Sequence, residues 1–84
     1  MIQIAFRPLL ISGMISGEAA GSMQLILIDS EQEESEQDVA VFHEALHLLF
    51  DAAGKAHLKN EDLIDAMAKA AAAAVPGIAM MLKR

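Results

Sequence analysis

The chain has 84 residues, a formal net charge of -6 with histidine neutral, and no cysteine. This length fits a single domain with a modest core, and the absence of cysteine excludes disulfides and thiolate metal sites. The negative charge argues against nucleic acid as a partner, because binding to phosphate requires a basic face, but it leaves a basic protein partner open.

Neither a membrane span nor export is indicated by the sequence. No apolar run approaches the length of about 18 residues that predicts a membrane span. Arg7 is the only early cation, and no convincing cleavage site follows an apolar run, so we expect no signal peptide. A cysteine-free chain suits the cytoplasm, which is the location that we expect. The oligomeric state is not predicted by any of these features.

Three short strands are predicted in residues 1–28. Residues 2–6 alternate roughly with period two and include β-branched side chains, and Pro8 ends this run or places it at a sheet edge. A second apolar run covers residues 11–16, and a loop rich in turn-forming residues follows it. Residues 23–28 have the strongest strand pattern of the chain. We expect the three strands to form an antiparallel meander.

An acidic stretch covers residues 29–38 and holds six of the twelve carboxylates. The pattern is typical of a solvated loop that leads into a helix, with Ser35 as the N-cap and acidic residues in the first turn. Glu31, Glu33 and Glu34 are expected to lie outside the helices. The alternative that the sequence leaves open is an acidic surface that docks on a basic partner.

Two helices are predicted in the second half of the chain. The first covers residues 35–54, and Gly54 is typical of a helix C-terminus. Asn60 is a good N-cap for a second helix over residues 60–75, which Pro76 ends or kinks. The apolar residues that we expect to form the core face of the first helix are Phe42, Ala45, Leu46, Leu49 and Ala53. Residues 1–84 are thus expected to form one α+β domain, a short three-stranded antiparallel sheet followed by an antiparallel helix pair.

The first helix carries the sequence His43-Glu44-Ala45-Leu46-His47, an H-E-x-x-H motif. Residues four apart share a helix face, so the two histidines point the same way and can bind one zinc ion. Glu44 lies beside the first of them, where a carboxylate can deprotonate a metal-activated water. The motif therefore predicts zinc as a cofactor, with His43 and His47 as ligands and Glu44 as the base. The alternative is an amphipathic helix with two unrelated histidines.

A catalytic zinc site usually has three protein ligands, so the chain must supply one more. The candidates are His57, Glu61, Asp62 and Asp65. Counting inward from the turn of an antiparallel helix pair places Asp65 level with His47. Glu61 then lies about one turn too far away, although its longer side chain can reach, and His57 requires the connecting loop to fold back. We therefore rank Asp65 first, Glu61 second and His57 third. The alternative for Asp65 is an exposed carboxylate paired with Lys69 at i+4.

This order of elements resembles the small zincin-like metallopeptidases of the ImmA/IrrE and minigluzincin type, which include compact phage and prophage members. Residues 41–49 are similar to their metal helix, and residues 61–68 are similar to their second helix, where a Glu commonly precedes Ala. The resemblance implies a minimal zincin-like domain with the two histidines as zinc ligands, Glu44 as the base and Asp65 as the third ligand. This chain has Asp at position 65 where the family usually has Glu.

Three functions remain open on the sequence alone. The first is a zinc-dependent metallopeptidase that cleaves a peptide or protein substrate, which residues 23–28 bind as an extended strand at a sheet edge. The second is a zincin-like domain that binds metal but acts in interaction or regulation without catalysis. The third is a metal-free acidic binding protein. The chain contains no tyrosine, and His57 is the only imidazole outside the motif that could stabilise an oxyanion.

Overall fold

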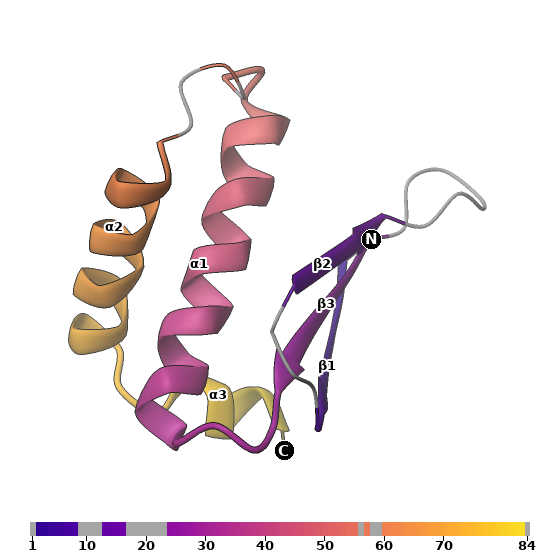
Figure 1. The fold of residues 1–84 in the computed structure, drawn as a ribbon, viewed down its shortest axis with the longest axis vertical. Helices are drawn as coiled ribbons and strands as arrows, with labels where there is room; N and C mark the ends of the chain where they lie inside the picture. Colours follow the sequence, from indigo (N-terminus) through magenta and orange to yellow (C-terminus); the bar gives the residue numbers. More distant parts are fainter. Residues whose placement is uncertain (1, 9–12, 17–23, 56, 58–59, 84) are drawn as a thin grey trace.

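The computed structural model describes residues 2–8, 13–16, 24–55, 57 and 60–83. Its elements are the strands β1 (Ile2–Arg7), β2 (Gly13–Ser16) and β3 (Gln24–Asp29) and the helices α1 (Glu34–Ala52), α2 (Glu61–Ala74) and α3 (Ile78–Lys83). Figure 1 shows the long helix α1 between α2 on one side and the sheet on the other, with the short helix α3 near the start of α1. None of the helices in the described ranges is both long and apolar enough to cross a membrane.

The sheet is mixed, so the predicted antiparallel meander is wrong. β3 lies in the centre of the sheet. It pairs in parallel with β1, with Ile2 opposite Gln24, and antiparallel with β2. Side-chain alternation along a strand determines its buried face but not its neighbours, and the most apolar strand takes the central place. Because both edges of β3 are paired, it is also not the edge strand that we expected to bind a peptide. The free edges belong to β1 and β2.

The core lies between one face of the sheet and the helices α1 and α3. Ile26 and Ile28 of β3 are almost fully buried, and as residues two apart they point to the same face. They form one apolar cluster with Val41 and Leu48 of α1 and with Ala79 of α3. Each of these isoleucines stabilises the fold by about 1.5–3 kcal/mol through removal of its side chain from water.

The first helix begins earlier than predicted. α1 starts at Glu34 with Glu33 at the N-cap position, whose side chain makes no capping hydrogen bond, so the assignment of Ser35 as N-cap is wrong. Glu34 therefore lies inside the helix, where its carboxylate is 3.0 Å from Lys83 Nζ. The amide of Gln37 donates to the backbone carbonyl of Gln32 at 2.7 Å, which ties the preceding turn to the helix.

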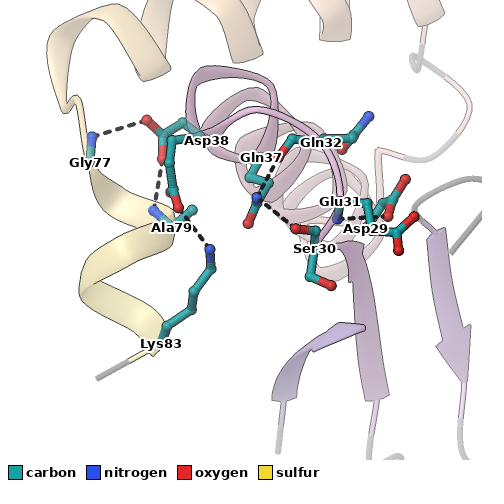
Figure 2. Close-up of polar contacts among 10 residues, drawn as sticks. Asp29, Ser30, Glu31, Gln32, Gln37, Asp38, Gly77, Ala79 and Lys83 are labelled. Carbon is teal, nitrogen blue, oxygen red and sulfur yellow. Dashed lines mark hydrogen bonds and ion pairs between the residues drawn. The ribbon is translucent and has the colours of Figure 1, made fainter. Parts of the chain in front are cut away.

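A buried carboxylate joins α1 to α3. Asp38 is 6% exposed and accepts hydrogen bonds from the backbone N–H groups of Gly77 at 3.0 Å and Ala79 at 2.8 Å (Figure 2). These amides lie at the start of α3, where helix N–H groups have no partner within the helix. Asp38 thus anchors the last helix to the N-terminal half of α1.

α2 packs beside α1, and its buried residues are one isoleucine and two alanines. Ile64, Ala68 and Ala72 recur every four residues on α2 and are buried. Gly54, just after α1, has a φ of +71°, the left-handed conformation that glycine adopts at helix ends. The predicted N-cap of the second helix is confirmed, because Asn60 Oδ1 accepts the backbone N–H groups of the second and third residues of α2.

Candidate metal centre

The two histidines of the motif face each other on α1. His43 and His47 are one helical turn apart, and their Nε2 atoms are 3.3 Å from each other. Their rings have centroids 5.0 Å apart and are tilted by 50°. Both side chains are mostly buried, with 25% and 18% exposed. The helical spacing thus brings two ring nitrogens together in the way that the motif predicts.

Glu61 completes this group from the neighbouring helix. It is the first residue of α2, and its carboxylate oxygens lie 3.3 Å from His43 Nε2 and 3.1 Å from His47 Nε2. The Asn60 cap fixes where α2 begins, and a carboxylate in the first turn of a helix is favoured by the helix dipole. The side chain of Glu61 is 69% exposed, so the group is accessible to solvent from this side.

The donor set and its distances fit a tetrahedral zinc ion. Zinc binds histidine nitrogen and carboxylate oxygen at about 2.0–2.2 Å, so two ligands of a tetrahedral site are about 3.3–3.5 Å apart. The three separations among His43, His47 and Glu61 are 3.1–3.3 Å, close to that value. Two histidines and one glutamate are also a ligand set of catalytic zinc sites, in which the fourth position is left to water or substrate.

The structure does not bring Asp65 into this group. Asp65 Oδ2 lies 2.9 Å from Lys69 Nζ, the i+4 pairing that we considered as its alternative. The ammonium of Lys69, through its hydrogen bond, holds the pKa of Asp65 below its ordinary value, and Asp65 in turn raises the pKa of Lys69. Glu61, and not Asp65, is therefore the carboxylate that lies beside the histidines.

The remaining candidates lie outside the group as well. Among the described residues, His43, His47 and Glu61 are the only set of three potential ligands whose donor atoms come close enough to share an ion. His57 is exposed in the connection between the helices, and Asp62 is exposed in the first turn of α2. The longer side chain of Glu61 is the signal in the sequence that favours it, because its reach compensates for a position about one turn from Asp65.

A cavity of about 460 Å³ opens beside this group of three residues. Its lining includes His43 and Glu44, preceding residues of α1 and Lys69 of α2. Glu44 is partly buried, and its carboxylate makes no hydrogen bond or ion pair to any part of the chain that the structure describes. A carboxylate that is unpaired and shares a cavity with His43 is suited to accept a proton there.

No protein-family model, curated protein or solved structure matches this chain.

Proposed function

We propose that this chain is a zinc-dependent metallopeptidase. The ligands are His43, His47 and Glu61, and the base is Glu44. The observation that carries the proposal is the set of three donor atoms 3.1–3.3 Å apart, contributed by two helices, beside a cavity that Glu44 also lines. Glu61 takes the place of Asp65 in this proposal, because Asp65 is paired with Lys69.

In this proposal, each residue of the site has a distinct role in peptide hydrolysis. When bound, zinc lowers the pKa of a water toward neutrality and polarises the scissile carbonyl. Glu44 accepts a proton from the attacking water on a carboxylate oxygen and then donates it to the nitrogen of the leaving amine. The peptide bond breaks, Glu44 passes the second proton of the water to the same nitrogen, and a carboxylate and an ammonium group form while Glu44 returns to its ionised state. His43 and His47 stay on a rigid helix, which holds the reacting groups in register.

The proposal requires metal content and hydrolysis to be measured separately. Protein purified without a histidine tag is loaded with zinc, and its metal content is determined by mass spectrometry. Hydrolysis of fluorescently quenched casein is then compared between the wild type and Glu44→Gln. We expect Glu44→Gln to keep its zinc and to lose activity by about 10²–10⁴-fold, the usual contribution of a general base.

Glu33→Gln is the matched control for this experiment. Glu33 is an exposed carboxylate at the start of α1 and does not line the cavity, so the same change of charge there leaves hydrolysis unaffected. Absence of bound zinc refutes the proposal altogether. Zinc binding without any hydrolysis refutes the catalytic part and favours a metal-binding domain that acts in interaction or regulation.

A further inference from the structure

The cavity beside the metal centre extends along one face of α1. Glu36, Ala40 and His43 follow each other at helical spacing on that face, and all three line the cavity. Glu36 precedes His43 by seven residues, which corresponds to about 10 Å along the helix axis. The cavity therefore has one end at the proposed metal centre, and its other end is lined by the carboxylate of Glu36 together with Ser35 and Gln32.

The lining between these two ends is apolar. Val39 and Ala40 lie between Glu36 and His43 in the lining, and their side chains are hydrocarbon. An occupant that follows this path meets the reacting groups first, then an apolar stretch, and finally a carboxylate. A long side chain with an apolar stem and a charged head has the same order of parts.

The charge at the far end is negative. Glu36 is exposed, and within the described ranges its side chain has no hydrogen bond or ion pair. Lys69 is the cation of the cavity lining, but its ammonium lies 2.9 Å from Asp65, so this pair is neutral as a unit. Glu36 and Glu44 are therefore the uncompensated charges of the lining, and Glu44 is assigned to proton transfer.

We propose that the cavity binds a lysine or arginine side chain of the substrate next to the cleaved peptide bond, with Glu36 taking its cationic head. This specificity rests on the proposed peptidase function. The free α-amino group of a substrate is not the cation that Glu36 would bind. It would lie beside the scissile carbonyl, whereas Glu36 lies about 10 Å from His43 along the helix axis. The side chain of Glu36 leans toward the start of α1, away from His43. The net charge of -6 also attracts cationic peptides to the protein.

The test compares peptides that differ in one side chain. Quenched fluorescent peptides of otherwise identical sequence carry lysine, norleucine or glutamate on either side of the scissile bond. Norleucine keeps the apolar stem of lysine and lacks only the ammonium group. Zinc-loaded wild type should cleave the lysine peptide with a kcat/KM roughly fivefold above that of the norleucine peptide, the upper range for one exposed ion pair.

Glu36→Gln should abolish this preference by lowering the kcat/KM of the lysine peptide to that of the norleucine peptide, while the variant still binds zinc. Glu33→Gln, the matched loss of an exposed carboxylate outside the cavity, should keep the preference. A lysine preference that persists in Glu36→Gln overturns the inference. A preference for the glutamate peptide that is lost in Lys69→Met also overturns it, because Lys69 would then select an anion.

Equilibrium binding separates this inference from the function on which it rests. The same peptides are titrated into zinc-loaded Glu44→Gln, with and without Glu36→Gln, and followed by fluorescence anisotropy. Tighter binding of the lysine peptide that depends on Glu36 supports the cavity as a site for a basic side chain, even where the wild type cleaves no peptide. Equal binding of the lysine and norleucine peptides refutes it, whatever the outcome of the casein assay.

Discussion

Replacement of Glu61 by alanine should remove the metal, whereas replacement of Asp65 should not. The two carboxylates lie one turn apart on α2, so the pair of variants removes the same charge from the same helix. Glu61 contacts both histidine rings at 3.1–3.3 Å, and Asp65 is bonded to Lys69. Only the first change takes a donor atom away from the metal centre.

The size of the effect follows from the number of ligands. Loss of a partner that merely orients a ligand costs about 10–100-fold in metal affinity. Loss of one of three ligands exceeds this, so Glu61→Ala should weaken zinc binding by more than about 100-fold, or roughly 2.8 kcal/mol. Glu61→Asp shortens the side chain by one methylene and should give an intermediate affinity, because the carboxylate remains but is drawn back from the rings.

Competition with a chromogenic zinc chelator measures these affinities. Circular dichroism of the metal-free variants serves as a control for the helix, since loss of the first-turn carboxylate weakens the dipole interaction by about 0.3–1 kcal/mol. Zinc affinity that survives in Glu61→Ala and falls in Asp65→Ala would refute the assignment of the third ligand. In that case α2 would have to shift by a turn relative to α1 when the ion binds.

Four further outcomes are expected. EDTA should lower the melting temperature of the zinc-loaded protein by several degrees, because a ligand of the folded state is withdrawn; an unchanged melt would argue against a structural contribution of zinc. Asp38→Ala should destabilise the fold by about 3 kcal/mol in urea unfolding, since two backbone N–H groups lose a charged acceptor. Glu31→Gln and Glu33→Gln, at exposed positions, should each change stability by less than about 0.5 kcal/mol in the same assay. Lys69→Met should raise the pKa of Asp65 toward its ordinary value in a carbon-detected NMR titration; because this pKa is lowered in the folded chain, the pair stabilises the fold above the unfolded pKa and loses that effect as the pH falls through the folded pKa.

The helices were predictable because their signals are local. The α2 cap at Asn60 and the turn at Gly54 depend on residues within a few positions of each other. Strand order depends instead on which strands meet across the chain, and alternation within residues 2–6 contains no information about that choice. The α1 start was misplaced for a similar reason, because Gln37 and Asp38 hold its first turns through contacts with the preceding turn and with α3.

The candidate site also combines residues whose positions follow from local sequence with one whose position depends on tertiary packing. His43, Glu44 and His47 share one helix, so their relation follows from the helical repeat alone. The proposed third ligand comes from another helix, and its register depends on how the two helices pack and on how far each side chain reaches. Counting at equal rise treats both helices as parallel rods with ideal spacing. Small differences in helix tilt and in the length of the connection shift the relative position of the two helices by as much as one turn, which is the distance from Asp65 to Glu61.

The arrangement of the helices would give a bound metal ion a second role. α2 is rich in alanine, and of its buried residues only Ile64 has a large side chain, so it gains little from apolar burial. An ion held by His43 and His47 of α1 and by Glu61 of α2 would link the middle of α1 to the first turn of α2. Such a link supplies the stability that a small core lacks. The same three side chains would then both close the helix pair and form the reaction centre, so removal of zinc should loosen α2 before it unfolds the sheet.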